Sequence, residues 1–118
     1  MAGVVGIGGV FFRAIDKAAL AAWYEQHLGV TGLWNQEAGL TVFAPFAADT
    51  DYFPAAKQWM LNFRVDDLDG LIGQLAAAGI AVETRPDEWD HPETGRFGRI
   101  EDPEGNAIEL WEPATPRP

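Results

Sequence analysis

Residues 101–110 read EDPEGNAIEL, and this stretch decides how the chain folds. Pro103 has a fixed φ, while Gly105 and Asn106 tolerate the positive φ that a tight reversal of the backbone requires. Segments suited to short β-strands flank this reversal at 97–101 and 107–112. The sequence therefore predicts a β-hairpin over residues 97–112.

The hairpin closes the second of two similar halves. The chain repeats itself at an offset of about fifty residues, because FRAID at 12–16 corresponds to FRVDD at 63–67. In each half an expected strand, at 7–14 or 59–65, leads into an expected helix. Further short strands are expected at 32–36, 40–46 and 80–84.

Both expected helices carry start and stop signals. Asp16 is placed to cap the first helix, and Gly29 is placed to end it in the left-handed conformation. Asp66 or Asp67 caps the second helix, which ends at Gly79. Apolar residues at helical spacing lie between these signals.

Composition excludes several classes of function. Eighteen acidic against eight basic residues give a net charge of −10, which is the wrong sign for binding nucleic acid or an anionic membrane. The absence of cysteine and serine from the sequence excludes thiolate metal sites and serine or cysteine nucleophiles. The apolar stretch 4–12 has no basic leader and is too short to span a bilayer, so a cytoplasmic protein without a membrane partner is expected.

The repeated halves and the ending DPEGNAIEL resemble the vicinal oxygen chelate superfamily, which includes glyoxalase I, bleomycin-resistance proteins and extradiol dioxygenases. The resemblance implies an α+β fold in which two βαβββ modules form a curved mixed sheet around a cavity. Module one then covers about residues 1–56 and module two about 57–113, with a loose tail at 114–118, all in a single domain. The resemblance also implies a homodimer.

Enzymes of this family hold a divalent metal with His and Glu side chains from four strands. At the matching positions this sequence has Gly9, Met60 and a residue near Ala44, or residues 51–52 after a small shift. Only Glu109 matches a ligand position, and one carboxylate cannot supply the several protein ligands of a catalytic zinc or non-haem iron site. No metal cofactor is therefore expected, with a divalent metal held by other residues as the alternative.

Strand alternation predicts which side chains line the cavity, because residues two apart share a face of the sheet. Leu61, Phe63 and Val65 are expected to face the helix, so their neighbours face the cavity. The predicted binding residues are Phe11, Arg13, Met60, Asn62, Arg64, Phe97, Arg99 and Trp111, with Glu109 and Glu101 as candidate catalytic carboxylates. Aromatic walls with a few charged groups are typical of a small-molecule site.

An unpaired carboxylate in such a cavity would be costly. Arg13 and Arg64, at equivalent positions of the two halves, are expected to pair with Glu109 in a network that replaces the metal. The alternatives are a purely structural ion pair at Glu109 and arginines that only extend into solvent at strand ends. Residues 87–95 are expected to form an acidic loop, with Trp89 as the apolar contact of a lid over the cavity.

Two functions remain open from the sequence. The first is a glyoxalase or bleomycin-resistance-like protein that binds a small organic molecule without chemistry or metal. The second is an enzyme of the lyase, isomerase or dioxygenase type, either metal-free with Glu109 or Glu101 as general base or dependent on a divalent metal. Nucleic acid is not an expected partner of either.

Overall fold

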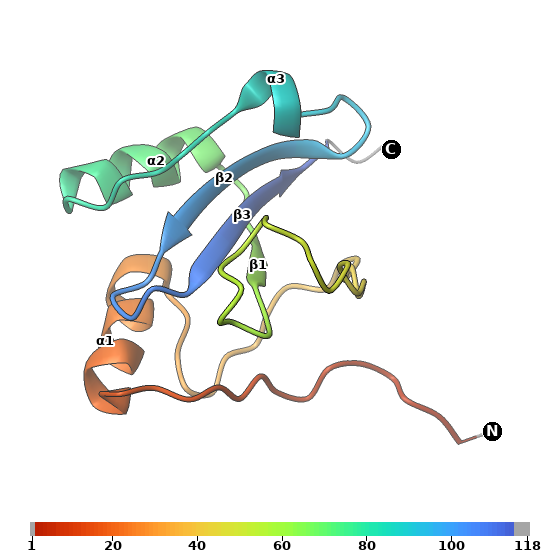
Figure 1. The fold of residues 1–118 in the computed structure, drawn as a ribbon, viewed down its shortest axis with the longest axis vertical. Coiled ribbons are helices and arrows are strands. Elements are labelled where there is room, and N and C mark those ends of the chain that lie inside the picture. Colours follow the sequence, from red (N-terminus) through yellow and green to blue (C-terminus); the bar gives the residue numbers. More distant parts are fainter. Residues whose placement is uncertain (1, 115–118) are drawn as a thin grey trace.

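A three-stranded sheet forms the centre of the molecule (Figure 1). The structure is a computed structural model that describes residues 2–114. Strand β1 (Leu61–Arg64) runs parallel to β3 (Ala107–Pro113), and β2 (Gly95–Glu101) pairs with β3 antiparallel, giving the order β1-β3-β2. The predicted hairpin is confirmed, with its reversal at residues 102–106.

The two predicted helices begin and end at their signals. In α1 (Lys17–Leu28), the Asp16 carboxylate accepts from the backbone N–H three residues on at 3.1 Å, and Gly29 follows with a left-handed φ of 69°. In α2 (Leu68–Ala77), Asp67 accepts in the same way at 3.0 Å. These contacts satisfy amides that a helix leaves open at its start.

A third, short helix, α3 (Pro86–Trp89), lies in the segment expected to be a loop. Pro86 occupies its first turn, where the missing N–H of proline costs nothing. Carbonyl oxygens of Arg85 and Pro86 accept the amides of the turn that contains Trp89. This turn places the Trp89 ring edge-on against the Tyr52 ring.

The core lies between α1, α2 and one face of the sheet. In Figure 1, α2 runs alongside β2, and α1 lies beside the turn from β2 to β3. The buried side chains of this core are Leu20, Tyr24, Leu68, Leu75, Ile100, Ile108 and Leu110. Their burial identifies the sheet face that α1 and α2 cover.

The turn after β2 also contacts the first half of the chain. Asp102 is only 4% exposed, and its Oδ2 accepts from the hydroxyl of Tyr24 on α1 at 2.7 Å. The Glu104 carboxylate accepts from the backbone N–H groups of Ile15 and Asp16 at 2.7 and 3.0 Å. Two of the acidic residues in EDPEGN therefore hold the start and the core face of α1.

The strands expected in the first half are not strands in residues 2–114. Segments 7–14, 32–36 and 40–46 have no ladder partner, and 80–84 contributes only an isolated bridge between Glu83 and Arg99. The physical reason is that a strand exists only where its backbone groups are paired, and β-propensity cannot supply the missing neighbour. The α+β class is confirmed, but the sheet of a single chain comes entirely from the second half.

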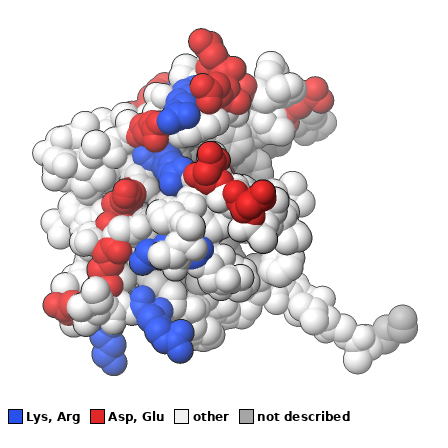
Figure 2. Space-filling model, in the orientation of Figure 1, with Lys and Arg blue, Asp and Glu red and all other residues white. Residues whose placement is uncertain are grey.

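The first half consequently leaves large apolar side chains in solvent. Phe11 is 94% exposed and Leu33 is 99% exposed. Figure 2 shows the N-terminal segment projecting from the body without charged side chains, and residues 2–12 contain none. Across residues 2–114, no helix has the length and apolar character needed to cross a membrane.

Candidate functional site

The strand register confirms the predicted alternation of side chains. On the helix-covered face, Phe63 lies opposite Leu110, which lies opposite Gly98. On the other face, one row runs across the sheet from Asn62 through Glu109 to Arg99, and the next from Arg64 through Trp111 to Phe97. Five of the eight predicted binding residues therefore lie on the same face as Glu109: Asn62, Arg64, Phe97, Arg99 and Trp111. A sixth, Met60, directly precedes β1.

Glu109 is held by two neutral donors. The amide nitrogen Nδ2 of Asn62 donates to its Oε1 at 2.7 Å. The hydroxyl of Tyr52 donates to its Oε2. Burial, followed by this hydrogen bond and the negative charge of Glu109, raises the pKa of Tyr52 above its usual range, so the phenol remains protonated.

Aromatic and cationic side chains surround the ring of Tyr52. The guanidinium of Arg99 lies 5.2 Å from the centre of the Tyr52 ring, and its Nη1 donates to the Tyr52 carbonyl oxygen. The Trp89 ring meets the Tyr52 ring edge-on, with the ring centres 6.1 Å apart. The guanidinium carbon of Arg85 lies 5.3 Å from the centre of the Trp89 ring. Phe46 adds a tilted ring at 5.9 Å.

The second row contributes a flat aromatic surface. Phe97 and Trp111, directly opposite on β2 and β3, have rings 5° from parallel with centres 6.2 Å apart. The indole N–H of Trp111 donates to the carbonyl oxygen of Thr94 at 2.8 Å, which fixes the plane of that ring. The two rings therefore extend the site along the sheet from Glu109.

The expected pairing of Arg13 and Arg64 with Glu109 is wrong for the described residues. Arg64 donates instead to the Glu37 carbonyl oxygen at 2.8 Å. Arg13 is exposed on the N-terminal segment. Tyr52 and Asn62 satisfy the carboxylate, so it does not require a guanidinium.

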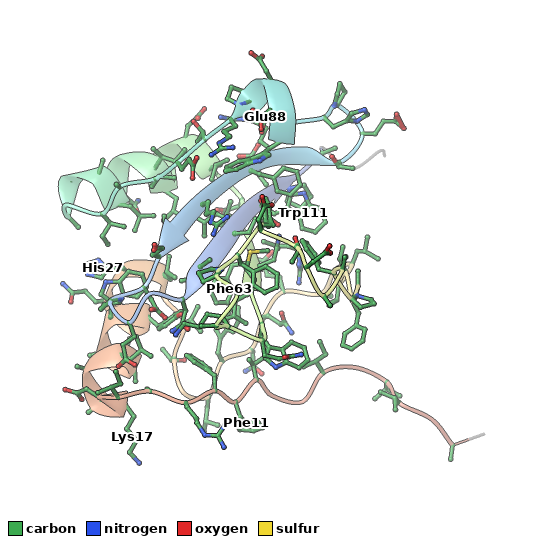
Figure 3. The ribbon with its side chains drawn as sticks, in the orientation of Figure 1. Phe11, Lys17, His27, Phe63, Glu88 and Trp111 are labelled. Carbon is green, nitrogen blue, oxygen red and sulfur yellow. The ribbon has the colours of Figure 1, made fainter. Side chains whose placement is uncertain are left out.

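The N-terminal segment does not reach this face. Phe11 lies far from Trp111 along the N-terminal segment in Figure 3, and Arg13 follows it closely in sequence. The reason is the missing strand at 7–14, whose pairing was needed to carry these side chains to the sheet. Tyr52, which does reach Glu109, belongs to a segment outside any helix or strand, where periodicity gives no signal.

Other carboxylates near the hairpin have different positions. Glu101, the second candidate base, is exposed at the last residue of β2. The Oε1 atom of Glu112 accepts from the backbone N–H of Leu68 at 2.8 Å and so completes the start of α2. Glu109 is thus the acidic side chain of β3 on the open face of the sheet, which is the face that α1 and α2 do not cover.

The residues present do not fit the divalent metal that the family implies. Gly9, Ala44 and Met60 provide no carboxylate or imidazole, and Glu109 is engaged by Tyr52 and Asn62. In the part of the chain that the structure describes, no group of three His, Cys, Asp or Glu side chains converges on a point. These side chains therefore support no chemical step through a metal ion.

Two hollows lie away from Glu109. A space of about 430 Å³ lies at the far end of the hairpin, and its lining includes Asp90, His91, Arg96 and Glu112. A space of about 60 Å³ lies on the helix side, near Leu28 and Leu110. Neither is lined by Glu109, whose Oε2 accepts from the Tyr52 hydroxyl.

Similarity to known proteins extends over most of the chain. The model of the Glyoxalase/Bleomycin resistance protein/Dioxygenase superfamily matches residues 6–110. The crystal structure of TnmS3, an antibiotic binding protein from Streptomyces sp. CB03234, is similar with 28% identity and a TM-score of 0.51, over 84% of this chain and 88% of that one. A glyoxalase/bleomycin resistance protein from the same organism has 28% identity and a TM-score of 0.48, over 82% and 91%. No curated protein matches the chain.

Proposed function

The chain belongs to the Glyoxalase/Bleomycin resistance protein/Dioxygenase superfamily, and on this premise we propose that it binds a small organic molecule on the sheet face around Glu109, without a metal and without chemical turnover. The observation that carries this proposal is the convergence of Asn62, Glu109 and Arg99 in one row beside the stacked rings of Phe97 and Trp111. The similar structure of an antibiotic binding protein supports the same function.

The composition of this face suits ligand binding. Small-molecule sites combine apolar and aromatic walls with a few polar groups that fix orientation. Here the aromatic rings supply contact area, Glu109 supplies an acceptor, and Asn62 and Arg99 supply donors. Segment 47–60 must move aside to admit a ligand, because Tyr52 now covers Glu109.

A general base would need hydrogen-bond reach to a substrate proton. Glu101 is exposed at the end of a strand, and both oxygens of Glu109 are occupied by donors of the chain until Tyr52 moves aside. The similar structure of an antibiotic binding protein favours binding without chemistry over the enzyme alternative. Elemental analysis of the purified protein is expected to find no stoichiometric divalent ion, and a firmly bound ion would contradict the metal-free part of the proposal.

Binding is tested by thermal unfolding with a panel of aromatic antibiotics. A ligand that binds only the native state stabilises it by about 2.7 kcal/mol at 100 times its Kd. Asn62→Ala is expected to weaken the effect, while Glu25→Gln on the exposed side of α1 leaves it unchanged. If the wild-type protein converted a ligand chemically and Glu109→Gln did not, the protein would be an enzyme instead. If no compound stabilised the protein, the proposal would be refuted.

We also propose that two copies pair through their first halves. The accessible surface of the chain is 9179 Å², whereas a folded monomer of 12.9 kDa exposes about 6,300 Å². The radius of gyration is 15.1 Å, compared with about 13.5 Å for a compact domain of this length. This excess is more than the roughly 800 Å² per partner that a standard interface buries.

A second copy would complete the sheet. The outer edge of β1 has no neighbouring strand in the described residues, and the segment around Phe11 has apolar side chains and no partner strand. Pairing of these elements between copies would supply the two-module curved sheet. Sedimentation equilibrium is expected to show a dimer that Phe11→Asp dissociates, and a monomeric wild-type protein at micromolar concentration would contradict this arrangement.

A further inference from the structure

The phenol ring of Tyr52 occupies the candidate site in the way a bound ligand would. We propose that the ligand of this site is a neutral hydroxylated aromatic molecule, whose hydroxyl donates to Glu109 in place of the Tyr52 hydroxyl. The inference rests on the proposed binding function and adds the chemical class of the ligand. Tyr52 is then a competitor that belongs to the chain itself.

The polar contacts select a hydrogen-bond donor. Glu109 lies on β3, the central strand, and Asn62 on β1 holds one of its oxygens at 2.7 Å. The other oxygen faces Tyr52. When Tyr52 leaves, Asn62 keeps the carboxylate in place, and an ionised carboxylate accepts hydrogen bonds but cannot donate one. A hydroxyl therefore fits this position, and an ether or a carbonyl does not.

The surroundings of the Tyr52 ring select an aromatic body for that hydroxyl. Arg99 on β2 lies 5.2 Å from the ring centre, an arrangement in which a cation attracts an aromatic face. Trp89 on α3 meets the ring edge-on. Both partners belong to elements outside segment 47–60, so they remain in place for a different ring after Tyr52 has moved.

Tyr52 is suited to exchange with a ligand because its segment is tied to the sheet at few points. Among the described residues, the hydrogen bonds that join 47–59 to the sheet are the two made by Tyr52, to Glu109 and from Arg99. The other hydrogen bonds of the segment are local, such as Thr50 N–H to Ala47 and Lys57 N–H to Pro54. Loss of the two Tyr52 contacts frees the segment without breaking a strand.

Charge at the site favours a neutral ligand, because Glu109 would repel an anion and the guanidinium of Arg99, 5.2 Å from the centre of the Tyr52 ring, would repel a cation. The net charge of the chain is −10, and the carboxylate of Glu109 would repel a second negative group at the same place. The raised pKa of Tyr52 is consistent with this, because burial and Glu109 both oppose a phenolate there. Phenols with a pKa near about 10 are neutral at pH 7 and meet this requirement.

The test is calorimetric titration with 2-naphthol and with 2-methoxynaphthalene, which has the same rings but no hydroxyl hydrogen. Wild-type protein is expected to bind the naphthol about 10-fold or more tightly than the ether, the effect of one hydrogen bond to a charged acceptor. In Tyr52→Phe the affinity for naphthol is expected to rise, because the internal competitor has lost its hydroxyl. In Glu109→Gln the preference for naphthol is expected to fall, because an amide oxygen is a weaker acceptor.

The outcomes separate this inference from the binding function. Equal affinity of the wild-type protein for both probes would overturn the ligand class while leaving small-molecule binding intact, and this comparison needs no variant to fold. Weaker naphthol binding in Tyr52→Phe would show that Tyr52 is a wall of the site and not a competitor. Failure of both probes to bind any of the three proteins would overturn the binding function and this inference together.

Discussion

The hydroxyl of Tyr24 on α1 donates to Oδ2 of Asp102 at 2.7 Å across 78 positions of sequence. Asp102 also accepts from the side-chain amide of Asn106 at 2.7 Å and from two backbone N–H groups of its own turn. Each donor reduces the cost of keeping this carboxylate out of water. The acidic turn is therefore a structural element that joins the halves of the chain, whereas Glu109 on the next strand lies on the open face.

Tyr24→Phe is expected to lower the free energy of unfolding by about 1.5–3 kcal/mol, the range for a hydrogen bond to a charged group. The ring still fills the core, so the loss reports the hydroxyl alone. Urea denaturation measures the change. Tyr52→Phe is the matched control and should cost about 1 kcal/mol or less, because water can replace the hydroxyl at half-buried Glu109. Equal losses in the two variants would contradict the structural role of the Tyr24 contact.

Stability is expected to fall at alkaline pH. Burial, and then Asp102, raise the pKa of Tyr24 above its usual range. The unfolded phenol loses its proton above about pH 10 while the folded one keeps it, so the stability contributed by Tyr24 is fully present below that pH and falls by about 1.4 kcal/mol per pH unit above it. Tyr52, whose pKa is also raised, adds to this slope in the wild-type protein, so the slope of Tyr24 alone is measured in Tyr52→Phe. Urea midpoints measured between about pH 8 and 11 test the slope. In Tyr52→Phe, phenolate absorbance that appears while the far-ultraviolet circular dichroism is unchanged would show that Tyr24 ionises in the folded protein.

Glu109→Gln is expected to lower the pKa of Tyr52 toward its ordinary value. Burial is the largest cause of the raised pKa and remains, but the charge and acceptor strength of Glu109 are removed, and Arg99 continues to lower the pKa. The chain has two tyrosines, so an absorbance titration in a Tyr24→Phe background follows Tyr52 alone. Glu25→Gln in the same background is the control. An identical titration in Tyr24→Phe alone, with Glu109→Gln and with Glu25→Gln would show that Tyr52 does not contact Glu109.

Local signals in the sequence were sufficient for the hairpin and both long helices. The Asp16 and Asp67 caps, the glycine at 29 and the reversal at 102–106 depend on interactions within a few residues, which any chain of this sequence makes. Alternation then assigned Asn62, Arg99 and Glu109 to one face, because the side-chain period of a strand is independent of its partner.

Interactions between distant segments could not be predicted in this way. The strands expected at 7–14, 32–36 and 40–46 required neighbours that the single chain does not provide. One of the two donors to Glu109 is a tyrosine 57 positions away in an irregular segment, and no periodicity connects these two residues. The arginine network failed for the same reason, since Arg13 depended on a strand that does not form.

A pair of glycine substitutions tests the hairpin against the helix. Gly95 has a φ of +122°, and a Cβ there would collide with the backbone of Glu112 and Pro113 on the adjacent strand. Gly73 lies in the middle of α2 on its solvent-exposed side, and no atom lies within 4 Å of the added Cβ. Gly95→Ala is therefore expected to destabilise by about 2 kcal/mol or more, since strain and overpacking add, whereas Gly73→Ala stabilises by about 0.5–1 kcal/mol.

Urea denaturation of the two variants beside the wild-type protein measures both changes. The pair is informative because the chemical substitution is the same and only the backbone environment differs, so effects on the unfolded chain are similar. If Gly95→Ala were as stable as Gly73→Ala, β2 could not approach β3 as closely as the register of Gly95 with Pro113 requires. The placement of Phe97 and Arg99 on the open face would then have to be revised, because both follow from that register.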